Sequence, residues 1–354
     1  MTVQKSSGRH CRSCAITLLW LCSFFLGAAI GQSPSNDPGI TTQATLQDKL
    51  SKGVQFEFGN ERFRPTESVS QLLLSPDERH VVSLDDSISI WDSQSGDQRW
   101  SISLSESEMG NRGNAAYGHR PLVFSKKTGA LLSYGDRGIL LEWDLDRRRS
   151  NSIDIESNGT IPFAHSTCRS IDISNDDRWI AIGNSSGVSV LDRAGKELWS
   201  VENRPHEREG RYLKEDRLAF DGVNALVRFS PLSDSLAISL SENPKEIAIL
   251  NPKDGKEIQR LKLKGALVRM DYSPDGLTVV ATERDSAIRL YRIANGEPIW
   301  EYRPNLSNPY ENYLSDVTFS PDGNRIVACA TDYDLYLTDA KTGENISRMS
   351  GHVW

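Results

Sequence analysis

The chain contains few of the side-chain groupings that catalysis or metal binding requires. Its six histidines share no ligand spacing such as His-x-x-x-His. No glycine-rich phosphate loop follows a predicted strand, and no Gly-x-Ser-x-Gly nucleophile elbow is present. Asp332 and Asp334 begin like a calcium loop, but the third acid and the distal glutamate are missing, which favours an ordinary turn. We therefore expect no catalytic, cofactor-binding or metal-binding residues, and no cofactor.

The candidates that remain for recognition are aromatic and basic residues in four long connections. These connections span residues 105–121, 156–167, 203–222 and 303–313. Tyrosine and arginine are the side chains that often dominate the energetics of protein contacts. The residues expected to bind a protein or peptide partner are Tyr117, His119, Arg120, His206, Arg208, Arg211, Tyr212, Tyr310 and Tyr313. The alternative is that the four connections are insertions without a binding role.

Between the long connections the chain repeats a pattern of short β-type runs. Residues 314–352 contain four such runs, and the first turn between them is Ser320-Pro321-Asp322-Gly323. In such a turn proline presets φ, aspartate bonds to nearby backbone amides and glycine accepts a positive φ. The pattern predicts a four-stranded antiparallel meander of about 40 residues, which cannot bury both of its faces alone.

The turn that begins with a serine recurs along the chain. Equivalent serines stand at Ser75, Ser125, Ser174, Ser230 and Ser273, so that six copies follow one another at intervals of 43 to 56 residues. The predicted repeats span residues 68–104, 120–155, 168–201, 225–263, 266–302 and 314–350. Six stacked copies indicate one repeat array rather than two unrelated domains.

The Ser-Pro-Asp-Gly turn, the strand ends Trp91-Asp92 and Trp143-Asp144, and Gly118-His119 before the second repeat resemble WD40 repeats. A glycine followed by a tryptophan in the outer strand, as in Gly296 and Trp300, is similar to the Trp-docking repeats of quinoprotein-like and outer-membrane assembly propellers. The resemblance covers about residues 67–352. It implies an all-β propeller with four-stranded antiparallel blades, either a six-bladed ring or, with a slight preference, an incomplete seven-bladed one.

The same resemblance assigns structural roles and a face. The tryptophans expected to brace the blades are Trp91, Trp100, Trp143, Trp199 and Trp300. WD40 blades often carry a hydrogen-bonded set of Asp, His, Ser or Thr, and Trp, and here only the second repeat has all four. In such propellers the long connections emerge on one face. We therefore expect a non-enzymatic interaction scaffold; the alternatives are a quinoprotein-like cofactor-binding enzyme or a membrane-tethered sensor domain.

The N-terminal segment predicts export. Lys5, Arg9 and Arg12 precede the apolar run 15–30, and small residues follow near Gly31, so residues 1–31 have the pattern of a cleavable signal. The alternative is an uncleaved membrane anchor. Residues 32–53 are polar and predict a flexible linker. Residues 54–354 then form the propeller domain, in which the alternating stretch 54–58 is expected to complete the last blade. The expected location is periplasmic or extracellular.

The net charge narrows the classes of possible partner. Residues 1–31 hold three of the 41 basic residues and none of the 48 acidic ones, so 38 basic face 48 acidic residues, a net charge of −10, in the rest. This balance argues against nucleic acid or an anionic membrane as a partner.

Beyond residue 31 only Cys168 and Cys329 remain, which favours two buried small residues over a long-range disulfide.

Overall fold

A computed structural model describes residues 69, 71–84, 87–103, 122–134, 139–156, 168–184, 186–203, 225–240, 242–306, 313–331 and 334–349. The expected signal, the expected linker and the stretch 54–58 lie outside the described residues. Throughout the described part the secondary structure is β-strand and turn, with no helix.

The strands form six antiparallel sheets of four strands each, which we number as blades 1 to 6 along the chain. Blade 1 contains β1 (Gln71–Leu74), β2 (His80–Leu84), β3 (Ser87–Asp92) and β4 (Gln98–Ser103). Blade 2 contains β5 (Leu122–Phe124), β6 (Leu131–Tyr134), β7 (Leu140–Asp144) and β8 (Arg149–Ile153). Blade 3 contains β9 (Cys168–Ile173), β10 (Trp179–Asn184), β11 (Gly187–Asp192) and β12 (Glu197–Glu202).

The second half of the chain continues the same order. Blade 4 contains β13 (Leu226–Phe229), β14 (Leu236–Ser239), β15 (Glu246–Leu250) and β16 (Glu257–Lys262). Blade 5 contains β17 (Leu267–Tyr272), β18 (Thr278–Glu283), β19 (Ala287–Arg292) and β20 (Pro298–Tyr302). Blade 6 contains β21 (Leu314–Phe319), β22 (Arg325–Ala330), β23 (Leu335–Asp339) and β24 (Asn345–Met349).

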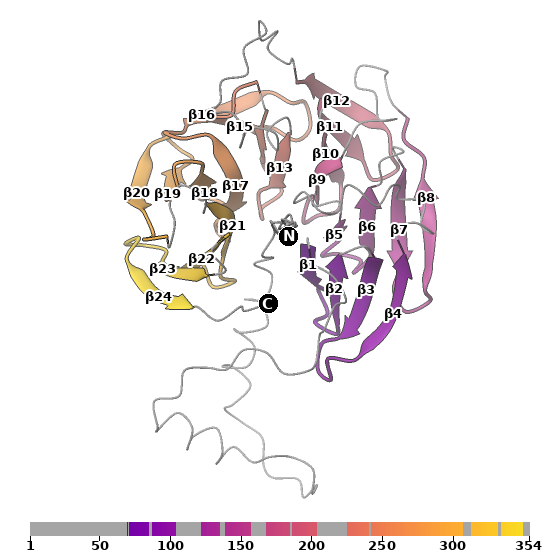
Figure 1. The fold of residues 1–354 in the computed structure, drawn as a ribbon. Coiled ribbons are helices and arrows are strands. Elements are labelled where there is room, and N and C mark those ends of the chain that lie inside the picture. Colours follow the sequence, from indigo (N-terminus) through magenta and orange to yellow (C-terminus); the bar gives the residue numbers. More distant parts are fainter. Residues whose placement is uncertain are drawn as a thin grey trace, which may run out of the picture.

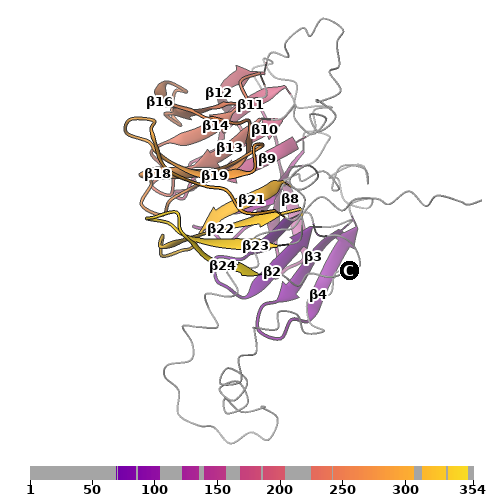
Figure 2. The same cartoon turned by 60° about the vertical axis from the view of Figure 1, so that its left-hand side comes forward.

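The six sheets stand around a common axis, with the first strand of each blade innermost and the fourth outermost (Figure 1). Figure 2 shows the same arrangement after a turn of 60°. This confirms the expected all-β propeller of four-stranded antiparallel blades. The described residues build six blades and no seventh.

Serine and aspartate side chains explain why the chain turns after each innermost strand. In blade 5 the Ser273 hydroxyl donates to Asp275 Oδ1 at 2.6 Å and accepts the Thr278 amide at 3.0 Å. The same geometry holds in blade 1, where the His80 amide donates to Ser75 Oγ at 2.9 Å. Each turn therefore satisfies its own backbone, and Gly276 takes the positive φ of 71° that closes it.

Alternation along the strands places the core between blades rather than within them. Val280 and Leu290 of blade 5 belong to the cluster shared with blade 6, whereas Val279 and Tyr291 belong to the cluster shared with blade 4. Successive residues point to opposite faces of a sheet, so each inner strand contributes to two clusters. Five such clusters join consecutive blades among the described residues.

Tryptophans of the outermost strands dock onto the following blade. Trp300 Nε1 of blade 5 donates to Ala340 O of blade 6 at 2.9 Å, and Trp199 of blade 3 makes the equivalent bond to blade 4 at 2.8 Å. The ring of Trp300 lies where a Cβ on Gly343 would be, 2.6 Å from Cδ2. The glycine that accommodates each tryptophan therefore belongs to the next blade, not to the tryptophan's own blade.

Blade 4 has Gln259 at the docking position. Gln259 pairs with Ile249 as Trp300 pairs with Leu290, and its Nε2 donates to Ala294 O of blade 5 at 3.3 Å. The hydrogen bond between the blades is kept, but the apolar ring is replaced by a short amide.

A second kind of tryptophan braces single blades. Trp143 Nε1 donates to Ser133 Oγ at 2.7 Å, as the WD40 resemblance implies for the second repeat, while His119 and Asp136 lie outside the described residues. The equivalent bond from Trp91 to Ser83, at 2.9 Å, also forms in blade 1. Trp91 was expected to brace its blade, but the first repeat lacks the complete four-residue set, so this bond was not predicted.

The one cysteine side chain that the structure describes is unbridged. Cys329 is fully buried, and its sulfur lies 3.2 Å from Ser315 Oγ. This agrees with the expectation of a small buried residue and gives no support to the long-range disulfide.

Candidate interaction face

The four long connections leave the ring at one end, which we call the interaction face. Each joins an outermost strand to the innermost strand of the next blade, and all innermost strands start at this end. Most of the residues expected to contact a partner lie outside the described residues: Tyr117, His119, Arg120, His206, Arg208, Arg211, Tyr212 and Tyr310. Tyr313 is described, and so are the residues that hold both ends of its connection.

The connection between blades 5 and 6 is fastened where it re-enters the sheet. The Thr331 amide donates to Tyr313 O at 3.0 Å, and the Tyr313 amide donates to Thr331 Oγ1 at 3.0 Å. Near its start, Leu306 is only 5% exposed and belongs to the apolar cluster between the two blades. The side chain of Tyr313 is half-buried. Both ends of the connection are therefore anchored in the ring.

Arg348 of β24 also contacts the connection between blades 5 and 6. Its Nη1 donates to Asn305 O at 3.3 Å, and its Nε donates to Asp334 Oδ2 at 2.6 Å. The guanidinium also lies over the ring of Tyr336, 5.6 Å from the ring centroid. A cation that is paired and stacked in this way is held in one orientation.

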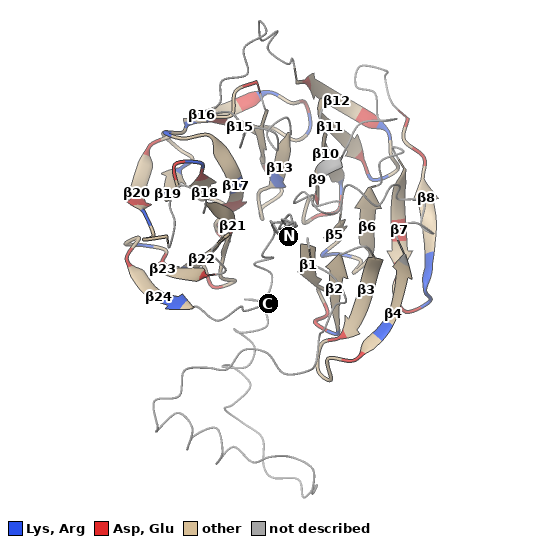
Figure 3. Cartoon of the chain, in the orientation of Figure 1, with Lys and Arg blue, Asp and Glu red and all other residues tan. Residues whose placement is uncertain are grey.

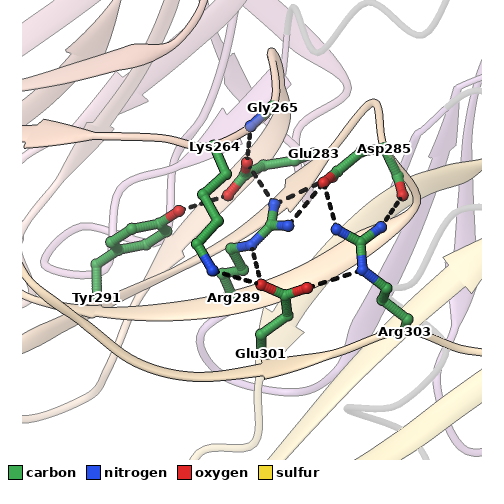
Figure 4. Close-up of polar contacts among 8 residues, drawn as sticks. All are labelled: Lys264, Gly265, Glu283, Asp285, Arg289, Tyr291, Glu301 and Arg303. Carbon is green, nitrogen blue, oxygen red and sulfur yellow. Dashed lines mark hydrogen bonds and ion pairs between the residues drawn. The ribbon is translucent and has the colours of Figure 1, made fainter.

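A group of charged residues with a buried centre, which we call the charge network, lies at the interaction face between blades 4 and 5 (Figure 4). Its centre is Arg289 of β19, which is 0% exposed. The guanidinium donates to Glu283 Oε2 at 2.5 Å, to Asp285 Oδ2 at 2.6 Å and to Glu301 Oε2 at 2.9 Å. Three carboxylates thus surround one buried cation.

The outer members of the network tie two connections together. Lys264, at the end of blade 4, pairs with Glu301 at 2.9 Å, and the adjacent Gly265 amide donates to Glu283. Arg303, where the connection to blade 6 begins, pairs with Asp285 at 2.6 Å and donates to the backbone carbonyl of the same residue. Tyr291 completes the set by donating to Glu283 Oε1 at 2.6 Å.

Hydrogen bonds and burial shift the pKa values of Glu301, Asp285 and Tyr291 in the network. Hydrogen bonds from Arg289 and Lys264 lower the pKa of Glu301 to about 2. Burial raises the pKa of Asp285, but hydrogen bonds from Arg289 and Arg303 outweigh it, and the pKa lies below its usual value. Burial and the bond to Glu283 raise the pKa of Tyr291. Glu301 and Asp285 are therefore held as carboxylates opposite the guanidinium groups of Arg289 and Arg303.

The charge network was not predicted from the sequence. Strand pairing shows that the place of Arg289 is taken in the other blades by Ser89, Leu141, Ser189, Ala248 and Tyr336. The available signal was an arginine within the otherwise apolar run of β19, together with acids at the adjoining turn. The carboxylates come from β18, from the turn after it and from β20, and Lys264 and Gly265 join them from the end of blade 4, so no single spacing along the chain revealed the set.

Metal binding has no support within the described ranges, where no group of three or more His, Cys, Asp or Glu side chains could hold an ion. The same ranges contain no helix that is long and apolar enough to cross a membrane.

Comparison with known proteins agrees with the architecture. The family model of the outer membrane protein assembly factor BamB matches residues 184–350, from the end of β10 to the end of blade 6. WD repeat-containing protein 1 of Gallus gallus is 32% identical over 73 residues, which are 18% of this chain and 12% of that protein. The match thus spans a small part of the relative. The described residues thus form a β-propeller of six blades, with docked tryptophans, and its repeats are similar to those of WD40 and quinoprotein-like propellers.

Proposed function

We propose that the protein is a non-enzymatic scaffold that binds a protein or peptide through the long connections of its interaction face. The charge network carries this proposal, because shared carboxylates link one buried cation to Arg303, at the start of the long connection 303–313, and to Lys264 in the short connection beside it. Connections whose ends are ordered before binding lose less conformational entropy when a partner docks. The similar family is described as an assembly factor, which also supports a role in contacts between proteins.

We further propose that the partner is met outside the cytoplasm. The similar family is named for the outer membrane, and residues 1–31 have the composition of an export signal. Sequencing the N-terminus of the protein isolated from its own cells tests this: cleavage predicts a start near Gln32. An intact Met1 in the membrane fraction would support the membrane-tethered sensor instead.

Affinity capture with matched variants tests the interaction face. The Tyr212→Ala and Tyr310→Ala double variant should weaken binding of a captured partner by about 10-fold or more, since buried tyrosines are frequent hot spots. The control is Lys253→Ala with Lys341→Ala, two exposed lysines in turns at the opposite end of the ring. An unchanged affinity in the tyrosine variant, or an equal loss in the lysine variant, contradicts the proposal.

The quinoprotein-like alternative makes a different prediction. A cofactor-binding enzyme isolated from its own cells should show a visible absorption band from a bound quinone and a stoichiometric metal. The scaffold should show only the protein absorption, with intact partner binding after exhaustive dialysis against a chelator.

A further inference from the structure

At the end of the ring opposite the interaction face, charged residues gather around the axis. The second residue before each turn serine occupies an equivalent place on the innermost strand; these residues are Leu73, Val123, Asp172, Arg228, Asp271 and Thr318. Figure 3 shows that charged residues lie mainly on turns and outer strands, and that a basic residue interrupts the inner strand β13. The four consecutive polar residues belong to blades 3 to 6.

The two carboxylates of this group, those of Asp172 and Asp271, accept hydrogen bonds from other groups of the protein. Asp271 Oδ1 accepts Arg228 Nε at 2.9 Å, and its Oδ2 accepts Thr318 Oγ1 at 2.8 Å and the Phe319 amide at 3.1 Å. Asp172 Oδ2 accepts the Phe229 amide at 2.7 Å. Each aspartate therefore joins its own blade to the following one, and their negative charges are partly neutralised by backbone amides.

The cations, in contrast, retain unused donors. Arg228 Nη1 is 3.9 Å from Asp172 Oδ1, which is too far for a hydrogen bond, and the arginine side chain is 40% exposed. Lys126, directly after the turn serine of blade 2, forms no hydrogen bond or ion pair with the residues that the structure describes. A guanidinium has five N–H groups and an ammonium three, so donors exceed acceptors here.

Lys126 lies within electrostatic reach of this group. Surrounding protein atoms, followed by the positive charge of Arg228, lower the pKa of Lys126, although the side chain keeps access to solvent. Asp172 and Asp271 act in the opposite direction. The charge of Arg228 thus disfavours the protonated form of Lys126, and both side chains have free donors. A group that can only accept hydrogen bonds would stabilise both cations.

We propose that this end of the ring axis is a binding site for one carboxylate or phosphate group, held between Lys126 and Arg228. Asp271 holds the guanidinium by Nε and Nη2, at 2.9 Å each, which leaves Nη1 for the ligand. Phosphate and carboxylate present only acceptor oxygens, and charge-assisted bonds to such oxygens are the strong ones. With two partly exposed cations we expect a dissociation constant on the order of 1 mM for a small anion.

Calorimetric titration of the full chain tests the site with two probes, inorganic phosphate and an acetylated, amidated peptide with a single glutamate. Lys126→Met removes the amine, keeps the apolar stem and breaks no described contact. Lys127→Met, the next residue in the same turn, is the matched control. We expect saturable binding of at least one probe that Lys126→Met weakens by 10-fold or more and Lys127→Met leaves unchanged.

The two probes separate the sources of the anion, a free phosphate or the side chain of an acidic peptide, and binding of either one supports the site. Absence of saturable binding of both probes at 20-fold above the expected constant, about 20 mM, overturns the proposal. Binding that survives Lys126→Met unchanged also overturns it, because the anion would then lie elsewhere. These outcomes are independent of partner binding at the interaction face.

Discussion

Replacing Arg289 by methionine removes the central cation of the charge network and leaves three carboxylates behind. Asp285 and Glu301 keep Arg303 as a partner, at 2.6 and 2.7 Å. Glu283 is 0% exposed and keeps only Tyr291 and the Gly265 amide. Removing one partner of a buried ion pair destabilises a protein by about 3–5 kcal/mol. We expect a loss in this range, most of it caused by Glu283.

Urea unfolding followed by tryptophan fluorescence measures the loss. The matched control is Arg260→Met, which removes an arginine that pairs with Glu246 and Glu257 at the surface, where its side chain is 40% exposed. Exposed ion pairs contribute about 1 kcal/mol or less. A large loss for Arg289 and a small one for Arg260 would show that burial, rather than the number of ion pairs, determines the effect.

The Arg289→Met variant should also gain a dependence on pH. A buried carboxylate without its cation takes up a proton more readily in the folded protein than in the unfolded chain. The folded state then binds more protons, so the stability of the variant falls as pH rises from 5 to 8. Adding Glu283→Gln should remove this slope and restore about 1–2 kcal/mol. A loss below 1 kcal/mol without a pH slope would refute our account of the network.

Three further predictions concern the docked tryptophan, its glycine and the stability in acid. Trp300→Ala should lower the free energy of unfolding by about 3–5 kcal/mol, because the ring is lost from the seam between blades 5 and 6; a loss below 1 kcal/mol in chemical denaturation would mean that the ring contributes little. Gly343→Ala should destabilise by about 1–3 kcal/mol more than Gly129→Ala. Both glycines have φ near 75°, but only Gly343 has a ring, that of Trp300, where the new Cβ would lie; equal losses would contradict this. Because the pKa of Glu301 is lowered to about 2, its contribution is present above the unfolded value of about 4.3 and is lost as pH falls through 2. Urea midpoints should thus be level from pH 7 to 5 and decline from pH 4 to 2, and a decline that begins above pH 5 would speak against this group.

The blades could be predicted because their signals are local. Turn serines such as Ser273 form hydrogen bonds with residues no more than five positions away. The alternation of apolar and polar residues indicates which side chains lie on each face of a strand. The seams between blades could not be predicted in the same way. Trp300 meets a carbonyl 40 residues away, and nothing in its own repeat indicates which glycine accommodates it.

The charge network illustrates the same limit more sharply. Glu283 lies at a strand end, Asp285 in a turn and Glu301 on an outer strand, and an acidic residue is common in each of these places. Only the fold brings them to one guanidinium, and only the strand register shows that other blades have no charge in that place. The expected contact residues of the interaction face, apart from Tyr313, lie outside the described residues and remain predictions.

The docking of a tryptophan onto the glycine turn of the succeeding blade gives the ring a direction. A protein engineer who exchanged blade 5 alone, cutting at the connections on both sides, would separate Trp300 from Gly343 and thereby break a complementary pair. The transferable module is instead offset, running from the outer strand of one blade through the turn that follows the third strand of the next. Chimaeras joined at that offset boundary should keep every tryptophan with the turn that receives it.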